Sequence, residues 1–251
     1  MNLDEFKILS VVLIFVTTVL AGLYPFLRKF KTTRPLESPA AEALASGVFL
    51  GAGLIHMLGD ASKSFLDHGI EYPIAFVLAG CVFLLLLWFE HLGRRLDEHG
   101  DSNSPAFAIL AMVILSIHSL LAGTVLGLSG SITMMVMILI AILAHKWAAS
   151  FSLAVQLSKS RLSLRQSLLM FGLFTLMLPL GVALGSGILE YTNSYPLLEP
   201  IFYSLAAGTF LYLGTLHGLK QSTMVDKCCD LKNFTFVVVG FLLMAVVAIW
   251  T

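Results

Sequence analysis

Charged side chains are scarce in this chain of 251 residues. Only 12% of its residues are Asp, Glu, Lys or Arg, whereas 58% are hydrophobic and the mean hydropathy is +0.91. This composition is too apolar for a water-soluble domain. The chain is therefore expected to be a multi-pass integral membrane protein that lies in the lipid bilayer. No nucleic-acid partner is expected.

Cysteines are also few, and a nucleotide-binding motif is missing. Cys81 falls inside an apolar run, and Cys228 and Cys229 are adjacent, so the three cysteines give no disulfide framework. The sequence contains no G-x-x-x-x-G-K-[ST] loop and no sizeable polar segment that could house a nucleotide-binding domain. Any transport by this chain would therefore run down an ion gradient or be coupled to another ion.

Long apolar runs are what the sequence has instead. A membrane-spanning helix needs roughly 20 apolar residues, and alternating barrel-type strands are absent, so an all-α membrane protein with eight transmembrane helices in a single domain, residues 1–251, is predicted. The eight runs cover residues 8–27, 42–59, 72–92, 106–128, 131–157, 166–189, 197–219 and 234–250.

The loops between these runs carry an uneven distribution of positive charge. Apart from Lys146, which lies within the fifth run, only Lys7 and Lys63 fall on the side that holds the two termini. All other lysines and arginines fall in the loops of the opposite side. Because basic loops stay in the cytoplasm, both termini are predicted to lie outside.

One apolar motif occurs twice. The second and seventh runs contain G47VFLGAGLIHML58 and G208TFLYLGTLHGL219, which share the pattern G-x-F-L-x-x-G-x-x-H-x-L. With eight spans, these two helices cross the membrane in opposite directions, so an inverted repeat of spans 1–3 (residues 1–93) and spans 6–8 (residues 165–251) around a central pair (residues 105–157) is expected. Inverted repeats of this kind are typical of transporters with a site near the membrane midplane.

The central pair of spans carries two histidines at similar depth. His118 lies twelve residues before Gly130 and His145 fifteen after it, so at about 1.5 Å per residue their depths differ by only about 5 Å. Ionisable residues within a bilayer are candidates for function. Imidazole nitrogens are good ligands for zinc, so this pair predicts a metal site.

The chain resembles the ZIP family of divalent-metal transporters over nearly its whole length. The resemblance rests on four segments in the family's order, and it is closest to the branch with His-Lys in span 5. The segments are G47VFLGAGLIHMLGDA61, H118SLLAGTVLGL128, A144HKWAASFSLA154 and A207GTFLYLGTLHGL219. The resemblance implies transport of zinc, with iron or another divalent metal as alternatives, into the cytoplasm. It also implies an elevator-like motion of spans 1, 4, 5 and 6 against spans 2, 3, 7 and 8.

Carried over residue by residue, the resemblance implies that His118, Ser119 and His145 are metal ligands. Lys146 stands where members with a two-metal centre carry an acidic or amide ligand, so its charge would substitute for the second ion.

The chain departs from the family by losing carboxylates. Ala122 replaces the usual glutamate four residues after His118, Ala149 occupies the corresponding place after His145, and His217 replaces an acidic residue. A metal held without these anionic ligands is expected to bind weakly.

Other candidate ligands lie toward the ends of the spans. His56 and Asp60 are four residues apart, on one helical face, and could receive a metal at the outer mouth. Glu90 and His91 close the third span on the cytoplasmic side, where an ion would leave.

Small residues also recur at a spacing that suits helix packing. Gly123 and Gly127 form one small-xxx-small pair, and Gly181 and Gly185 form another. Such pairs are expected to allow close approach of helices.

Two other functions stay open from the sequence. A homologue of the same fold that does not transport, or that carries a different ion, fits the loss of carboxylates. A membrane-embedded zinc hydrolase is less consistent with the sequence, because the inverted repeat places His56 and His217 toward opposite faces of the membrane. No enzymatic activity is therefore predicted. The short loops favour a bacterial inner membrane, and a homodimer is an open alternative for the assembly.

Overall fold

The computed structural model describes residues 2–31, 38–96, 105–192, 196–218 and 231–250. Within these residues the chain is helical and contains no β-strand. The elements are α1 (Leu3–Lys31), α2 (Pro39–Gly51), η1 (Ala52–Met57), α3 (Leu58–Asp67), α4 (Ile74–Leu96), α5 (Pro105–Leu128), α6 (Ile132–Lys159), α7 (Leu164–Thr192), α8 (Leu198–Tyr212), η2 (Leu213–Gly218) and α10 (Leu231–Val247). The all-α prediction is confirmed for this part of the chain.

Each of the eight apolar runs coincides with a helix or a continuous series of helices. Six of these segments are long and apolar enough to cross a membrane: Leu3–Arg28, Pro39–Asp67, Ile74–Leu92, Pro105–Leu128, Ile132–Lys159 and Leu164–Ile188. The seventh run forms α8 continued by η2, and the eighth forms the shorter helix α10. Many large apolar side chains on these helices are exposed, as expected for surfaces that face lipid.

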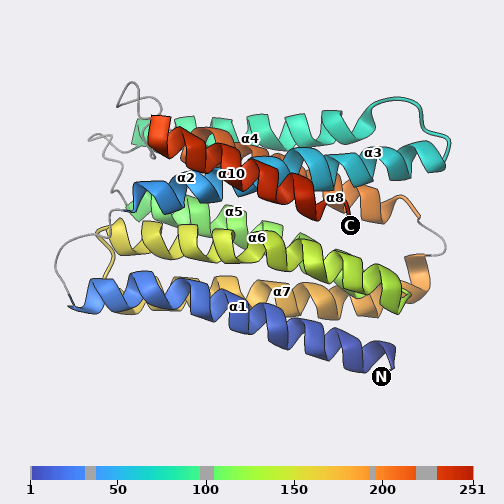
Figure 1. The fold of residues 1–251 in the computed structure, drawn as a ribbon, viewed down its shortest axis with the longest axis horizontal. Helices are drawn as coiled ribbons and strands as arrows, with labels where there is room; N and C mark the ends of the chain where they lie inside the picture. The colour runs from blue at the N-terminus through green and yellow to red at the C-terminus, as the bar shows by residue number, and fades with distance from the viewer. Residues whose placement is uncertain (1, 32–37, 97–104, 193–195, 219–230, 251) are drawn as a thin grey trace.

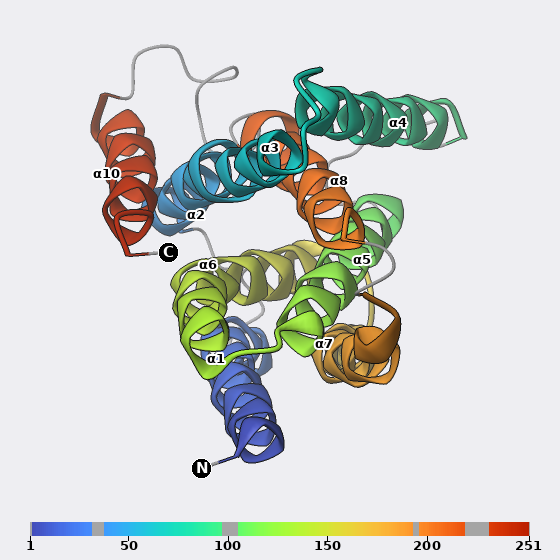
Figure 2. The same cartoon turned by 90° about the vertical axis from the view of Figure 1, so that its right-hand side faces the viewer.

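The helices form two bundles that lie side by side (Figure 2). Bundle A consists of α1, α5, α6 and α7, in which α5 packs on α7 and α1 packs on α6. Bundle B consists of α2–η1–α3, α4, α8–η2 and α10, in which α2 packs on α10 and α4 packs on α8. The bundles meet mainly where α5 contacts α8 and α6 contacts α2.

Glycines allow the closest helix pair in bundle A. A Cβ atom added to Gly123 or Gly127 would overlap a carbonyl oxygen of α7, and one added to Gly181 or Gly185 would overlap a carbonyl oxygen of α5. The close approach predicted for these two small-xxx-small pairs is therefore confirmed.

The two copies of the repeated motif pack against each other in bundle B. A Cβ atom added to Gly53 would meet the carbonyl oxygen of Ala207 and the side chain of Leu211, and one added to Gly214 would meet the carbonyl oxygen of Ser46 and the side chain of Leu50. Gly53 and Gly214 occupy the same place in the two copies, as do Leu50 and Leu211. The helices run in opposite directions, since α2 begins at the left end of the molecule in Figure 1 and α8 begins at the right end.

Both copies also contain the same irregularity. A six-residue π-helix interrupts each helix at the same place in the motif, at Ala52–Met57 and at Leu213–Gly218. These π-helices contain His56 and His217. Such insertions are rare and occur frequently at functional sites.

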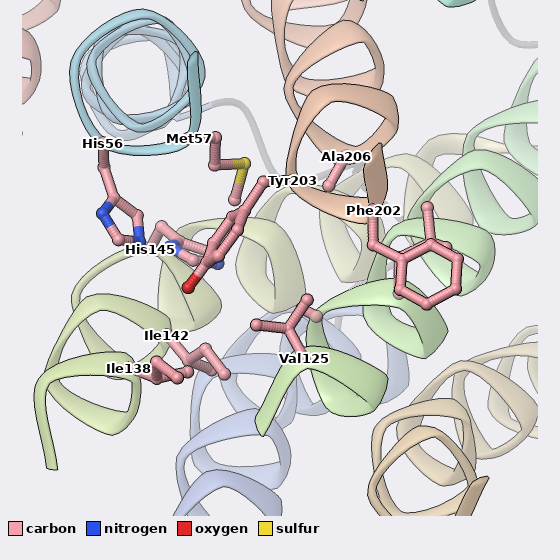
Figure 3. A pocket seen from close by; sticks show the side chains of 11 residues that line it. His56, Met57, Val125, Ile138, Ile142, His145, Phe202, Tyr203 and Ala206 are labelled. Carbon is pink, nitrogen blue, oxygen red and sulfur yellow. The ribbon is translucent and has the colours of Figure 1, made fainter. Parts of the chain in front are cut away.

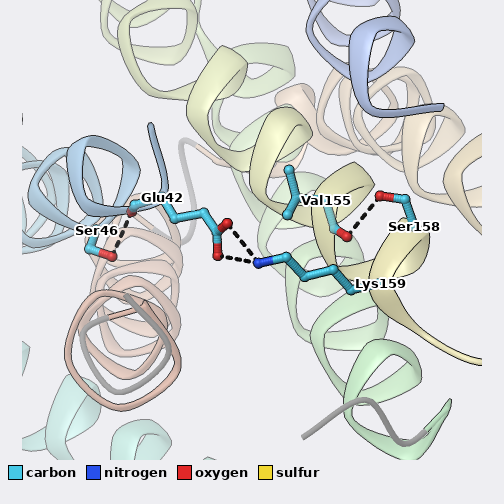
Figure 4. Close-up of polar contacts among 5 residues, drawn as sticks. All are labelled: Glu42, Ser46, Val155, Ser158 and Lys159. Carbon is cyan, nitrogen blue, oxygen red and sulfur yellow. Dashed lines mark hydrogen bonds and ion pairs between the residues drawn. The ribbon is translucent and has the colours of Figure 1, made fainter. Parts of the chain in front are cut away.

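One ion pair joins the two bundles near the end where α2 begins and α6 ends (Figure 4). The Nζ atom of Lys159 in α6 lies 2.7 Å and 2.9 Å from the two carboxylate oxygens of Glu42 in α2. Both side chains are largely shielded from solvent, with exposed fractions of 24% and 11%. The pair therefore fixes the bundles to each other at this end.

Candidate metal site

The centre of the molecule holds two neighbouring histidines. His118 and His145 lie near the middles of α5 and α6, and their ring centroids are 5.7 Å apart. Each side chain is only 2% exposed. The structure thus brings together the two histidines that the sequence places at similar depth.

His118 is held mainly by residues of α8, across the boundary between the bundles. Its Nδ1 atom lies 3.0 Å from Oγ1 of Thr209 and 3.4 Å from the carbonyl oxygen of Ala206. The Phe210 ring stacks on the imidazole at a centroid distance of 3.7 Å. The same Phe210 ring meets His145 edge-on at 4.9 Å. One face of the pair is therefore closed by α8.

Both histidines keep one ring nitrogen without a partner. Among the described residues, Nε2 of His118 and Nδ1 of His145 are buried and accept or donate no hydrogen bond. A buried polar group without a partner costs roughly 1 to 3 kcal/mol, and such groups are rare enough in proteins to need an explanation. These two nitrogens are suited to binding a ligand that arrives from outside the chain.

Lys146 and Ser119 lie beside the pair. The Lys146 ammonium donates a hydrogen bond of 2.8 Å to Oγ of Ser119 and lies 4.3 Å from the centroid of the Phe174 ring. Both side chains are buried. The lysine is thus accommodated by one hydroxyl and one aromatic face, and it occupies the hydroxyl that would otherwise be free to bind a metal.

A small cavity adjoins His145 (Figure 3). Its volume is about 10 Å³, which is roughly the room that a single water molecule needs. It lies toward the end of α5 and the start of α6, and Figure 3 shows His56, His145 and Tyr203 facing the same space. Its lining is His56, Met57, Leu121, Ala122, Val125, Ile138, Ile142, His145, Phe202, Tyr203 and Ala206.

His56 connects this cavity to Asp60. Nδ1 of His56 lies 2.8 Å from Oδ2 of Asp60, although the atoms are not aligned for a hydrogen bond. The His56 side chain is buried, whereas that of Asp60 is 40% exposed. The His56 ring also meets the Tyr203 ring edge-on at 5.8 Å. The partly exposed carboxylate of Asp60 therefore lies directly beside the buried imidazole of His56.

The remaining candidates do not form one cluster. Glu90 is buried and accepts a hydrogen bond of 2.8 Å from the Tyr212 hydroxyl, whereas the adjacent His91 is exposed and bonds to the Leu87 carbonyl of its own helix. The backbone of His217 belongs to η2, but its side chain lies outside the described part of the structure. Across the described ranges, no three His, Cys, Asp or Glu side chains converge as a ready set of metal ligands.

The centre can therefore offer two neutral nitrogen ligands but no anionic ligand from the residues described above. Ala122 lines the cavity and Ala149 is buried in the core, so neither place supplies a carboxylate. Imidazole nitrogens suit a borderline transition metal. The absence of a carboxylate at these two places, with Lys146 nearby, indicates weak rather than tight binding of a dication.

Three aromatic and hydroxyl residues around the pair were not identified from the sequence. Thr209 and Phe210 lie within the repeated motif, and Tyr203 lies two turns before them on α8. Phe210 corresponds to Phe49 in the other copy, whereas Thr209 corresponds to Val48. This polar substitution within an otherwise similar apolar motif was the signal that could have pointed to Thr209.

Comparison with known proteins gives one family. The family model described as "ZIP Zinc transporter" matches residues 90–248. The chain is 26% identical to zinc transporter ZIP2 of Homo sapiens, with 82% of this chain and 84% of that protein aligned. It is 26% identical to zinc transporter 11 of Arabidopsis thaliana, with 99% and 86% aligned, and 28% identical to zinc transporter ZIP1 of Danio rerio, with 80% and 81% aligned.

Proposed function

The chain belongs to the ZIP zinc transporter family, and we propose that it carries divalent metal ions, zinc above all, across a membrane as a transporter rather than an enzyme. The relatives named above are zinc transporters, and this chain aligns with most of the length of each of them. The observation that carries the proposal for this chain is the pair of unpartnered nitrogens on His118 and His145.

The spacing of the two rings fits a shared ion. At Zn–N bonds of about 2.0 to 2.1 Å, two imidazoles on one tetrahedral zinc have ring centroids about 5 Å apart. The observed separation of 5.7 Å is close to this value. Small changes in the side chains of His118 and His145 would let both bind one ion.

The other candidate ligands would serve before and after this central site. In this proposal Asp60 and His56 receive the ion and pass it through the small cavity to His145. Glu90, His91 and His217 lie nearer the opposite end of the molecule and would serve on the way out. Ser119 becomes a ligand only when Lys146 releases it, and Lys146 otherwise replaces the charge of a second ion.

The motion that completes transport would be a displacement of bundle A against bundle B. Bundle A contains the first, fourth, fifth and sixth spans, which is the set that the family resemblance assigns to the moving part. The proposed inverted repeat of residues 1–93 and 165–251 around residues 105–157 is supported by the equivalent surroundings of Gly53 and Gly214. Outward termini follow from the distribution of basic loops. Movement of the ion toward the cytoplasm is what the family resemblance implies.

A second candidate function is favoured by one observation. Lys146 is buried beside the histidines, and Ala122 and Ala149 offer no carboxylate to offset its charge. A homologue that binds its ion without moving it, or that carries a different ion such as iron, is consistent with this charge pattern. A zinc hydrolase needs three protein ligands on one ion, and the described residues provide no such set.

Uptake of radioactive zinc into sealed proteoliposomes tests the proposal. We expect His118→Ala and His145→Ala each to lower uptake roughly tenfold or more, whereas His68→Ala, an exposed histidine outside the site, should leave it unchanged. Normal uptake by the folded double variant would remove the central site. Zinc binding without uptake by the unaltered protein would favour the non-transporting alternative.

Three further experiments address the metal, the oligomeric state and the membrane in which the protein lies. Competition by iron and other divalent ions defines the metal, and light scattering on the purified protein separates a monomer from a homodimer. Membrane fractionation tests the bacterial inner membrane suggested by the short loops, since the relatives named above come from eukaryotes.

A further inference from the structure

Thr209 makes the only side-chain hydrogen bond that His118 has among the described residues. The side chain of Thr209 is 4% exposed, and it comes from α8 in bundle B, whereas His118 belongs to α5 in bundle A. The contact therefore crosses the boundary between the two bundles.

The direction of this hydrogen bond follows from a second one. The Thr209 hydroxyl donates its hydrogen to the carbonyl oxygen of Ala206 over 2.6 Å. A hydroxyl has a single hydrogen to donate, so Oγ1 of Thr209 can only accept from His118. The hydrogen between them is thus carried by Nδ1 of the imidazole.

The second neighbour of Nδ1 leads to the same assignment. The carbonyl oxygen of Ala206 lies 3.4 Å from Nδ1 of His118, and a carbonyl can accept but not donate. Both neighbours therefore require an N–H at Nδ1. In a neutral imidazole the other nitrogen, Nε2, then carries the lone pair, and this is the nitrogen that has no partner.

We propose that Thr209 is a positioning residue for metal binding: it fixes His118 as the tautomer protonated at Nδ1, so that the Nε2 lone pair is presented to the ion. This inference rests on the proposed function and deepens it. Metal-bound histidines commonly donate their second N–H to a protein group, which sets both the tautomer and the orientation of the ring. Phe210, stacked on the ring at 3.7 Å, adds a restraint on the plane of the same imidazole.

The two histidines of the centre are not equivalent in this respect. Nδ1 of His145 has no hydrogen-bond partner among the described residues. In the other copy of the repeated motif, the position of Thr209 is taken by Val48, which has no hydroxyl. In this proposal His118 is therefore the ligand of the pair whose ring is oriented by a side-chain hydrogen bond.

The test compares Thr209→Val, which keeps the shape but removes the hydroxyl, with Thr209→Ser, which keeps the hydroxyl. Thr18→Val is the matched control, because the buried Thr18 hydroxyl also donates to a carbonyl of its own helix, but has no hydrogen bond to a histidine within the part of the chain that the structure describes. Nitrogen-15 NMR of protein labelled at its histidines, in lipid nanodiscs without metal, reports the tautomer. His118→Gln identifies which signals belong to His118.

In the unaltered protein, Thr209→Ser and Thr18→Val, we expect the His118 signals of an imidazole protonated at Nδ1. Thr209→Val should shift them toward protonation at Nε2 and raise the KM for zinc uptake roughly tenfold. Unchanged His118 signals in Thr209→Val would overturn the inference, as would an equal rise in KM in Thr18→Val. Should Thr209→Val not survive purification, Thr209→Ala gives the same comparison. If the unaltered protein moves no zinc, the proposed function fails while the tautomer measurement still decides the role of Thr209.

Discussion

Ala122 is the residue at which this chain departs most informatively from the pattern that the family resemblance implies. It lies four residues after His118 and lines the cavity beside His145. A side chain longer than alanine at this place would project into the space next to the histidine pair. The carboxylate missing at position 122 of α5 is therefore one of the reasons for the weak binding expected at the centre, together with the one missing at Ala149.

Ala122→Glu is expected to tighten zinc binding. A carboxylate in the cavity would supply an anionic ligand in a region of low dielectric, where charge neutralisation matters most. Calorimetry on the purified protein should show zinc affinity raised by roughly tenfold, whereas Ala122→Gln, of the same size but uncharged, should show little gain. Equal affinities for the two variants would mean that position 122 does not face the ion. Uptake need not become faster, because an ion held more tightly also leaves more slowly.

The packing of α5 on α7 is set by glycines rather than by large side chains. At Gly181 an added Cβ atom would overlap the carbonyl oxygen of Leu120, which belongs to the backbone and cannot move aside cheaply. Gly172, on the same helix, is exposed and has no heavy atom near the corresponding position. A comparison of Gly181 with Gly172 thus separates the effect of helix packing from that of helix propensity.

Gly181→Ala is expected to lower the stability of the protein by roughly 1 to 3 kcal/mol, because the two helices must move apart. Gly172→Ala should be neutral or slightly stabilising, since alanine is the better helix former. Thermal unfolding in detergent, followed by intrinsic fluorescence, measures both. A Gly181→Ala protein that unfolds at the same temperature as the unaltered chain would contradict the close approach.

The two bundles are held differently at their two ends. The small cavity lies on the side of the histidine pair toward the end of α5, whereas the Glu42–Lys159 ion pair joins the bundles at the other end. A displacement of bundle A against bundle B that opened this second end would have to separate the pair. The arrangement is consistent with a conformation that is closed at the end where α2 begins.

Breaking the pair should therefore favour opening of that end. Ser158, buried next to Lys159 on α6, can be replaced by cysteine as a reporter in a chain whose three native cysteines are serine. We expect Glu42→Gln or Lys159→Gln to increase labelling by a water-soluble maleimide roughly fivefold, as the loss of about 1 kcal/mol implies. Combining Glu42→Lys with Lys159→Glu should restore slow labelling. The same rate in all variants would show that the ion pair does not hold this end closed.

Periodicity and composition determined the helices and much of their packing. Apolar runs of about 20 residues must be helical in a bilayer, because every backbone group has to be satisfied within the segment. The constant rise per residue of a helix placed His118 and His145 at similar depth. The spacing of the glycines marked a face of each helix that suits close packing, although not which helix would pack there. All of these properties are local along a helix, so the sequence by itself was sufficient for them.

The partners of individual side chains were decided only by the tertiary structure. Whether His118 meets Thr209, whether Lys146 meets Ser119, and whether Glu42 meets Lys159 depends on how each helix is rotated about its axis and how the bundles are set against each other. Glu90 and His91 are adjacent in the sequence, yet one is buried against Tyr212 and the other is exposed. Contacts of this kind join residues far apart in the chain, and their geometry follows from the packing of all the helices together.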